Sequence, residues 1–364
     1  MKLARLVAVA LTLSCAPSFD PDAPPDALEA VGDTTALGVI WWFTFDAQGA
    51  PLIATDTGVH RWTGAAWAAA PTAGMLGFPS QVIDDKRGAL IAVTAVGLFR
   101  LPQGAAAWEP FDGGVMKLAR MAVSTDGTLY ALQDRGPQSS TMRVHFRGPG
   151  DAMWTDSNVD VSVFAWPVAD RENAIWTESS ETLDVQRVSR TSVQTFPRAY
   201  GFQPALGHAV KTVEVDANGT HWGMATNYTT TFGDVIAWTP SRGEVSTKVT
   251  GATCTDGDGS SICDPTTTGG FISSVARAPD GTLYELWAKQ NGESPYLMRT
   301  SPGGSWAVVG DMFRQFSRGP GKLSSVRPQA LALYASPRGE IYLAGSSLQA
   351  GAQKGASFVV RLRK

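Results

Sequence analysis

The chain has 364 residues, 17% of them charged, and its formal net charge is -3 at pH 7. No cluster of Lys or Arg emerges that would neutralise phosphates, so the charge pattern argues against a nucleic-acid partner. The 38 Gly, 22 Pro and 12 Trp residues are typical of an all-β protein with many tight turns.

The N-terminal segment predicts export. Lys2 and Arg5 supply two positive charges ahead of a short apolar run at 6–13. This run is too short to span a bilayer and has the form of a secretory signal. We therefore expect residues 1–14 to be a signal peptide.

The junction that follows predicts a lipid anchor. Residues 11–15 resemble a bacterial lipobox, in which a small residue precedes a Cys that receives lipid, although Thr12 stands where Leu is commoner. The expectation is acylation of Cys15, and simple secretion is the alternative. Residues 15–26 are rich in Pro and Asp and cannot bury much apolar surface, so they predict a flexible tether.

A short phrase returns seven times along the chain: an Asp or Ser turn, a Gly or Asn shortly after it, and then a run of strand formers. Asp and Asn accept hydrogen bonds from the backbone ahead of them and Gly supplies a positive φ, so each phrase predicts a hairpin. The turns lie at 46–49, 85–88, 124–127, 170–173, 216–219, 279–281 and 337–339. Successive turn Gly or Asn residues are 39, 39, 46, 46, 62 and 58 residues apart, close to the roughly 40 to 50 of a four-stranded propeller blade.

Each repeat has room for two further strands. The third strands are expected at 59–62, 97–100, 142–146, 183–188, 235–238, 296–299 and 358–361. Aromatic residues mark most of the fourth strands: Trp67, Trp108, Trp154, Phe196 and Trp306. Four antiparallel strands per repeat predict an all-β fold, a seven-bladed β-propeller that spans residues 27–364 as one domain.

The last repeat is short by one strand, because the sequence stops at Lys364 just after its third strand. The segment 27–37 precedes the first repeat and has no other partner in the pattern. We expect it to supply the missing outer strand and to close the ring. The alternative is a frayed open edge, which is less favourable because an exposed strand row invites aggregation.

Two cysteines, Cys254 and Cys263, lie nine residues apart in an insertion rich in Gly, Ser and Asp. In an oxidising compartment this spacing predicts a disulfide that closes a small loop. The alternative is a metal pair, but no His stands near and structural zinc needs four ligands. Asp256, Asp258 and Asp264 are weak calcium candidates; a solvated turn explains them better, because the stretch lacks the ligand spacing of an EF-hand loop.

Loop lengths predict which face of the ring binds a partner. In an up-and-down blade the first and third turns lie on one face, while the second turn and the crossover to the next blade lie on the other. The long segments fall on second turns and crossovers, at 134–141, 197–211, 227–234, 243–273, 288–295, 311–329 and 345–357. Insertions collected on one face of a repeat scaffold usually mark the binding face.

The candidate ligand residues on this face are polar or aromatic. They are Arg135, His208, Tyr228, Asp234, Lys289, Arg314 and Arg318. His208 is the one His in an enlarged crossover and is a candidate catalytic base, but a catalytic role is assigned to no residue. No cofactor and no metal is expected. Polar residues in solvent loops are the plainer explanation for all seven.

The repeat at 82–100 resembles those of two-component regulator propellers, in which an Asp-x-x-Gly turn leads to Gly-Leu-Tyr-Arg; here these parts lie at 85–88 and 97–100. The similarity covers most of residues 38–364 and implies a propeller fold with an extracytoplasmic binding role. It does not imply signalling, because no transmembrane helix or kinase follows the repeats. Streptogramin lyase is a more distant relative, but its paired His-x-His element is not found in this sequence. The arginine triad of sialidase-like rings cannot be picked out either.

The sequence therefore predicts a lipid-anchored extracytoplasmic protein of a bacterium, in the outer membrane, the periplasm or at the surface. Its expected role is a binding or scaffolding module for a protein or a polysaccharide of the cell envelope, and the lipid is its expected link to the membrane. The alternative is a lyase or hydrolase, which would bring His, Glu or Asp side chains within hydrogen-bond reach of one another at the ring centre.

Overall fold

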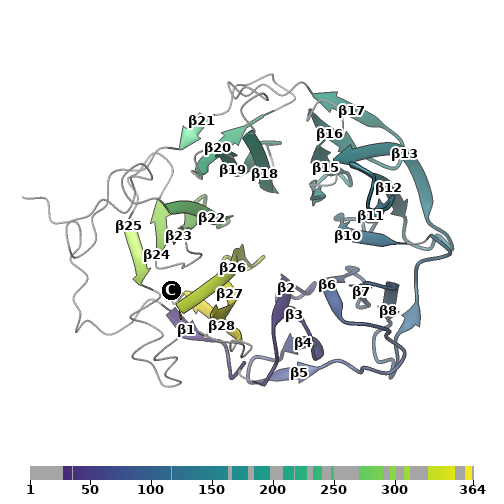
Figure 1. Cartoon of the computed structure of the whole chain (residues 1–364), viewed down its shortest axis with the longest axis horizontal. Coiled ribbons are helices and arrows are strands. Elements are labelled where there is room, and N and C mark those ends of the chain that lie inside the picture. The colour runs from purple at the N-terminus through teal and green to yellow at the C-terminus, as the bar shows by residue number, and fades with distance from the viewer. Residues whose placement is uncertain are drawn as a thin grey trace, which may run out of the picture.

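The computed structural model describes residues 28–34, 36–115, 117–162, 166–178, 184–196, 208–216, 218–227, 233–239, 247–249, 270–289, 296–300, 307–311, 327–348 and 357–362. The strands in these segments pair into seven four-stranded antiparallel sheets, which stand as blades around a common centre (Figure 1). The prediction of an all-β propeller built from four-stranded antiparallel blades is confirmed. No helix in this described part of the chain is long and apolar enough to cross a membrane.

Within a blade the strands follow chain order from the centre outward. The first three blades are β2 (Ile40–Phe45), β3 (Pro51–Thr55), β4 (Gly58–Trp62) and β5 (Trp67–Ala69); β6 (Pro79–Asp84), β7 (Leu90–Thr94), β8 (Gly97–Leu101) and β9 (Glu109–Pro110); and β10 (Leu118–Val123), β11 (Leu129–Asp134), β12 (Thr141–Arg147) and β13 (Thr155–Ser162).

The next three blades are β14 (Val168–Ala169), β15 (Ile175–Glu178), β16 (Val185–Val188) and β17 (Val193–Phe196); β18 (His208–Val215), β19 (His221–Asn227), β20 (Gly233–Trp238) and β21 (Thr247–Val249); and β22 (Gly270–Arg277), β23 (Leu283–Lys289), β24 (Tyr296–Thr300) and β25 (Ala307–Asp311). The last sheet contains β26 (Arg327–Ala335), β27 (Ile341–Leu348), β28 (Ser357–Leu362) and β1 (Leu28–Ala30).

The strand β1 occupies the outer position of that last sheet. It pairs antiparallel with β28, with Leu28 opposite Leu362, and the Val31 N–H donates to the carbonyl of Val359 at 2.9 Å. Leu28 is 2% exposed and belongs to the core of this blade. Chain segments from the two ends of the described part thus share one sheet.

The repeated phrase forms the turn between the first and second strands. In the first blade, Asp46 Oδ1 accepts the backbone N–H groups of Gln48 at 2.9 Å and Ala50 at 2.7 Å. The same pair of bonds is made by Asp85, Asp170, Asp216 and Ser336. One side chain therefore satisfies two backbone donors that the reversal would otherwise leave without partners.

An Arg on the third strand binds an acidic residue of this turn in four blades. The pairs are Arg61 with Asp46 at 3.2 Å, Arg100 with Asp85 at 3.8 Å, Arg187 with Asp170 at 2.8 Å, and Arg361 with Glu340 at 2.8 Å. The Arg at the last but one position of the third strand in these four blades is therefore a structural residue. It ties the turn to a strand that is not its sequence neighbour.

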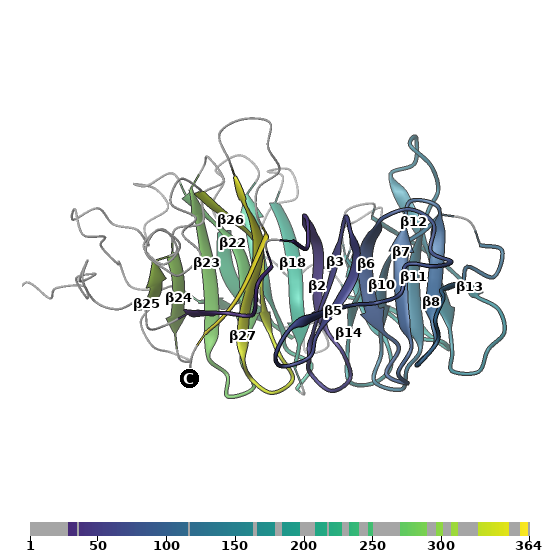
Figure 2. The same ribbon diagram turned by 90° about the horizontal axis from the view of Figure 1, so that it is seen from below.

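The hydrophobic core lies between neighbouring blades rather than at the ring centre. Leu52 of the first blade packs with Val82 and Phe99 of the second, and Phe43 and Ile53 of the first pack with residues of β27 and β28 in the last. Seen from the side, the ring has two faces: the short first turns lie along the lower edge of Figure 2, and the β11–β12 hairpin projects from the upper edge.

Candidate functional site

The inner strands share an irregularity that the sequence pattern does not reveal. Six of the seven carry a β-bulge, an extra residue on the inner strand that shifts the pairing with the second strand. The interruptions fall between Ile40 and Trp42, Pro79 and Gln81, Ala119 and Met121, Thr212 and Glu214, Ile272 and Ser274, and Ala330 and Ala332.

Several of the residues that follow a bulge make a bond to the next blade or line a cavity, and Ser274 does both. Gln81 donates to the carbonyl of Met121 and accepts from its N–H, both at 2.8 Å, and Ser274 Oγ accepts the N–H of Leu333 at 2.9 Å. These bonds join the bulge of one blade to that of the next. Elsewhere the equivalent residue faces a cavity, as Trp42 and Glu214 do.

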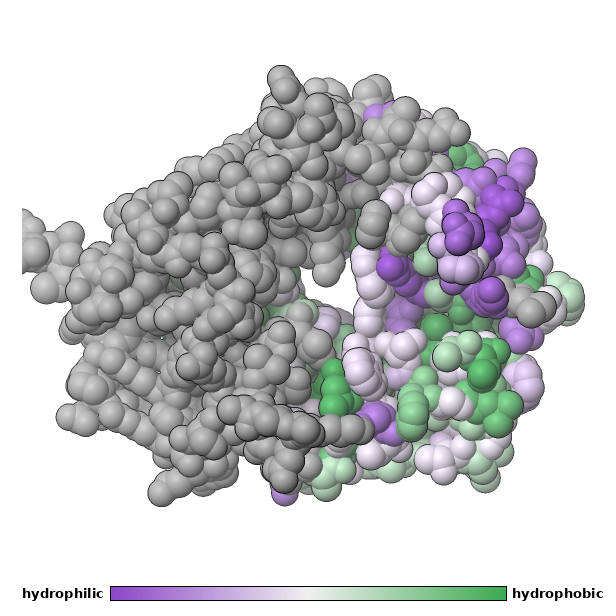
Figure 3. Space-filling view, in the orientation of Figure 1, coloured by the Kyte–Doolittle hydropathy of each residue, from purple (hydrophilic) through white to green (hydrophobic). Residues whose placement is uncertain are grey.

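The cavity lies at the ring centre and has a volume of about 720 Å³. Its wall is formed by the C-terminal parts of β2, β18, β22 and β26, next to the first turns, and by the segment at 166–168. Arg171, Pro279 and Pro337, exposed residues of three first turns, also line it, so the cavity extends to the face that carries those turns. Figure 3 shows the opening at the centre of the ring, viewed along its axis.

One side of the cavity is aromatic. The rings of Trp42 and Trp166 stack with centroids 5.5 Å apart and planes 18° from parallel, and the guanidinium of Arg120, the extra residue of the β10 bulge, lies 4.6 Å from the Trp166 ring. Trp166 nevertheless remains 39% exposed. Tyr334 completes this side, and burial raises the pKa of its hydroxyl well above its usual range.

The other side carries charge. Arg277 Nη1 lies 3.5 Å from Glu214 Oε1, and its Nη2 lies 4.0 Å from Asp216; the guanidinium also sits 4.8 Å above the ring of Trp222. Burial raises the pKa of Glu214, an effect that the positive charges of Arg277 and Arg171 partly offset. Asp216 is not among the residues that line the cavity. Its carboxylate accepts two backbone N–H groups of the turn and, at 3.1 Å, the indole N–H of Trp222.

This geometry suits non-covalent binding better than acid–base chemistry. Among the described residues that line the cavity, Glu214 is the one that carries a carboxylate. In the described segments, no group of three or more His, Cys, Asp and Glu is arranged to hold a metal ion. An exposed indole beside charged side chains is typical of a site that recognises both apolar and polar parts of one ligand.

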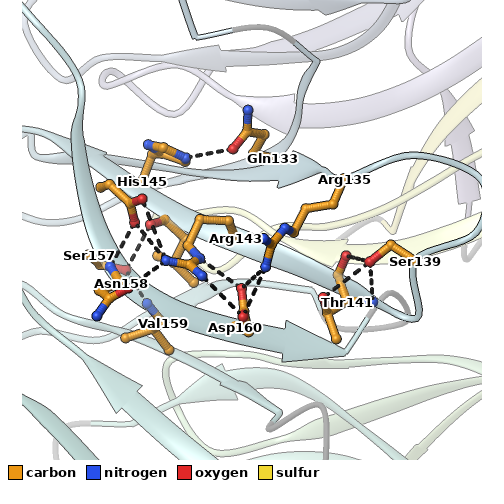
Figure 4. Close-up of polar contacts among 12 residues, drawn as sticks. Gln133, Arg135, Ser139, Thr141, Arg143, His145, Ser157, Asn158, Val159 and Asp160 are labelled. Atoms are coloured by element: carbon orange, nitrogen blue, oxygen red, sulfur yellow. Dashed lines mark hydrogen bonds and ion pairs between the residues drawn. The ribbon is translucent and has the colours of Figure 1, made fainter.

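Of the predicted ligand residues, Arg135 is described in full and has a structural partner. It lies beyond the end of β11 and donates to both oxygens of Asp160 on β13, at 3.0 and 3.1 Å. Figure 4 shows that Arg143 shares this carboxylate, with Nε 2.7 Å from Asp160 Oδ1, and also donates to Asn158. Hydrogen bonds to Asp160 raise the pKa of Arg143. This network ties β12 to β13 across a register shift.

The structure places three other predicted residues by their backbone. His208 begins β18, Asp234 lies near the start of β20, and Lys289 ends β23, all at the ends that lead to crossovers or second turns, as the loop lengths predicted. Tyr228, Arg314 and Arg318 lie outside the described residues, as do Cys15, Cys254, Cys263, Asp256, Asp258 and Asp264. Arg135, the one candidate whose side chain is described, is not among the described residues that line the central cavity.

Sequence reasoning missed the residues that do line it. Glu214 and Arg277 had a usable signal, because each is a charged residue at or next to the C-terminal end of an inner strand, close to the turn that the sequence predicted. Trp42 and Trp166 had none, since they are far apart in the sequence and Trp166 lies in a crossover.

The fold is shared with several solved proteins. The extracellular domain of BT4673 from B. thetaiotaomicron, named both as a one component and as a hybrid two component system, superposes with a TM-score of 0.58 and 14% identity over 92% of this chain and 40% of that one. The extracellular domain of the hybrid two component system BT3049 from the same organism gives 0.52 and 12%, over 93% and 42%. The chain is a propeller like these domains. It spans about two fifths of their length.

An enzyme has a similar fold as well. A fungal alcohol oxidase of the AA5 family, solved in complex with copper, gives a TM-score of 0.52 at 12% identity over 93% of this chain and 73% of that one. At such identities the likeness concerns the fold alone. No family model matches the sequence, and no curated protein matches it either.

Proposed function

We propose that this propeller is an extracytoplasmic binding module whose central cavity holds a short stretch or an end of a cell-envelope polysaccharide. In this proposal the seven sheets form one ring that is closed through β1. Cys15 carries the lipid, and residues 15–26 tether the ring to the membrane.

The central cavity is the observation that carries the proposal. Its volume of about 720 Å³ falls within the roughly 300 to 1,000 Å³ of small-ligand sites, so it suits a few sugar residues better than the surface of a folded protein. A sugar ring presents apolar C–H groups on its faces and hydroxyl groups at its edge. The exposed part of Trp166 matches the former, and Glu214 and Arg277 match the latter.

Location outside the cytoplasm is supported by two independent features. The charged start and short apolar run of residues 1–14 have the pattern of a secretory signal. The propellers of BT4673 and BT3049 are extracellular domains. A binding ring on the outer side of a membrane accords with both features.

A lyase or hydrolase at the ring centre remains the competing function. Hydrolysis of a glycosidic bond normally uses two carboxyl groups on either side of that bond. Glu214 supplies one, but the neighbouring Asp216 is held by the turn and by Trp222. The described cavity wall thus favours binding over hydrolysis.

A protein partner is a second candidate, supported by an apolar patch on the face of the crossovers and second turns. Leu76 and Phe78 of one crossover and Val96 of the next second turn are 64%, 68% and 62% exposed. They lie together, because Gly77 packs against Thr94 and Val96. Hydrophobic side chains also gather over β6 to β8 in Figure 3.

The test compares two exposed tryptophans, Trp166, which lines the cavity, and Trp41, which does not. The full chain, solubilised in detergent, is titrated with polysaccharide fractions from its own envelope. Trp166→Ala should weaken binding about tenfold, as expected for the loss of roughly 1.5 kcal/mol of aromatic contact. Trp41→Ala is the matched control, because Trp41 is 55% exposed but does not line the cavity.

Two results would contradict the proposal. One is unchanged binding in the Trp166→Ala chain, which would move the site away from the centre. The other is a chain that binds no polysaccharide but binds a protein partner, and that loses this partner in the Phe78→Ser variant. This result would favour a binding site on the crossover face.

A further inference from the structure

We infer that the ligand of the central cavity is an acidic saccharide whose carboxylate binds Arg171. This inference rests on the proposed function and names the chemistry that the site selects. Among the described residues that line the cavity, three are charged: Arg171, Glu214 and Arg277. In this described part of the wall, two guanidinium groups face one carboxylate, which gives an excess of one positive charge.

Arg277 is the guanidinium that balances Glu214. It lies 3.5 Å from that carboxylate and 4.0 Å from Asp216, and it rests on the ring of Trp222. These contacts occupy it on three sides and hold it within the wall, where its side chain is 19% exposed. Arg277 is thus a fixed part of the site rather than its free charge.

Arg171 is the unbalanced one. It lies in the turn whose Asp170 and Glu172 bind Arg187 from the third strand, just as Asp46 and Asp85 bind Arg61 and Arg100 in the first two blades. By contrast, the guanidinium of Arg171 has no ion pair and no hydrogen bond to any described residue, and only its carbonyl is used, as an acceptor for Thr125. It lies close enough to Glu214 for its charge to lower the pKa of that carboxyl.

The turn that carries Arg171 is held in place by the neighbouring blade. Thr125 Oγ1 lies 2.6 Å from Asn173 Oδ1, the N–H of Asp126 donates to the same oxygen at 3.0 Å, and the hydroxyl of Tyr130 donates to the carbonyl of Asn173 at 2.8 Å. A free guanidinium on a fixed turn at the rim of a cavity is a preorganised anion site, because little ordering is needed when the ligand arrives.

The ligand chemistry follows from the two sides of the cavity. A guanidinium recognises a carboxylate through two parallel N–H···O bonds. Trp166 and Arg171 line the same cavity, so one ligand can place a sugar ring on the exposed part of Trp166 and an attached carboxylate on Arg171. A cationic sugar is disfavoured, since Arg120 on the Trp166 ring adds a further positive charge beside the site. Hexuronate sugars combine these features.

The experiment uses a pair of probes that differ only in charge. Trigalacturonate and its trimethyl ester are each titrated into the full chain in detergent at fixed salt. We expect the acid to bind at least tenfold more tightly than the ester, since a charge-assisted pair contributes on the order of 1.5 to 3 kcal/mol. Arg171→Gln should remove that preference, whereas Arg87→Gln, an exposed turn residue outside the cavity, should retain it.

The outcomes separate this inference from the proposed function. Equal binding of acid and ester, or a preference that survives in Arg171→Gln, overturns the acidic ligand while leaving a saccharide site at the ring centre. Binding of envelope polysaccharide fractions without any binding of either probe also overturns it. If the unmodified chain binds no polysaccharide fraction at all, both the proposed function and this inference are overturned. Circular dichroism of each variant confirms that the propeller is folded.

Discussion

Replacing Asp170 by Ala should destabilise the propeller more than any other single change in the repeated turns. The carboxylate of Asp170 is 7% exposed and accepts four hydrogen bonds. Its donors are the N–H groups of Glu172 at 2.8 Å and Ala174 at 3.0 Å, the indole N–H of Trp176 at 3.0 Å and Nε of Arg187 at 2.8 Å. No other turn acid in the described segments shows both an indole bond and an Arg pair this short.

The magnitude follows from the donors that would lose their partner. A buried donor left without an acceptor costs about 1 to 3 kcal/mol, and more if it is charged. The Ala174 N–H and the Trp176 indole are buried, and Arg187 is 15% exposed. Since water and local shifts would satisfy part of the loss, we expect Asp170→Ala to lower the free energy of unfolding by about 3 to 5 kcal/mol.

The assay is urea unfolding followed by far-UV circular dichroism, with Asp46→Ala as the matched control. Asp46 makes the same two backbone bonds, but its Arg61 partner is 41% exposed and it has no indole donor. Its loss should therefore cost about 2 kcal/mol. If Asp170→Ala proved no more destabilising than Asp46→Ala, the indole and Arg bonds would contribute nothing, and the reasoning from unsatisfied donors would be refuted.

Burial lowers the pKa of His221 from 6.5 to about 3, so between these two pH values the unfolded chain binds a proton that the folded chain does not. The free energy of unfolding should therefore fall as the pH falls through this window, by up to about 1.4 kcal/mol per pH unit. His221→Gln should flatten the slope of unfolding free energy against pH. Leu28→Ala should cost about 3 kcal/mol in urea unfolding, because Leu28 is buried in the last blade; a loss below about 1 kcal/mol would mean that β1 is detached in solution. The unfolded, unreduced chain should contain no free thiol at Cys254 and Cys263, and two free thiols would rule out the disulfide. Cys15→Ser should be released from membranes by a salt wash, whereas retention would contradict the lipid anchor.

The repeated turns could be predicted from the sequence because their chemistry is local. Asp46 bonds to backbone groups two and four residues ahead, so the phrase contains its own explanation. The third strands could be predicted because a second run of strand formers follows each turn within the same repeat, and the structure adds that Arg61 and Arg100 of these strands bind the turn acids. The architecture of a blade is therefore determined by contacts within one repeat.

The cavity could not be predicted because it is built at long range. A β-bulge shifts the alternation of a strand by one residue, so the side chain that faces the centre is not the one that simple alternation selects. In β2 the shift falls between Ile40 and Trp42. Trp42 then meets Trp166, which comes from a different blade and from a crossover segment. Neither the bulge nor this meeting leaves a pattern within one repeat.

The division between structural and functional polar residues follows from the same geometry. The sequence alone does not distinguish a structural Arg from one that binds a ligand. Four Arg residues have an acidic partner within their own blade: Arg61, Arg100, Arg187 and Arg135. Arg171 stands one residue after the turn acid Asp170, but among the described residues it has no such partner, and it lines the cavity. In a repeat fold the scaffold recurs in every blade, so a charge that departs from the recurring pairs and reaches the centre is the one free to act on a ligand. That departure, rather than the length of the loops, is what directs attention to the first-turn face of this ring.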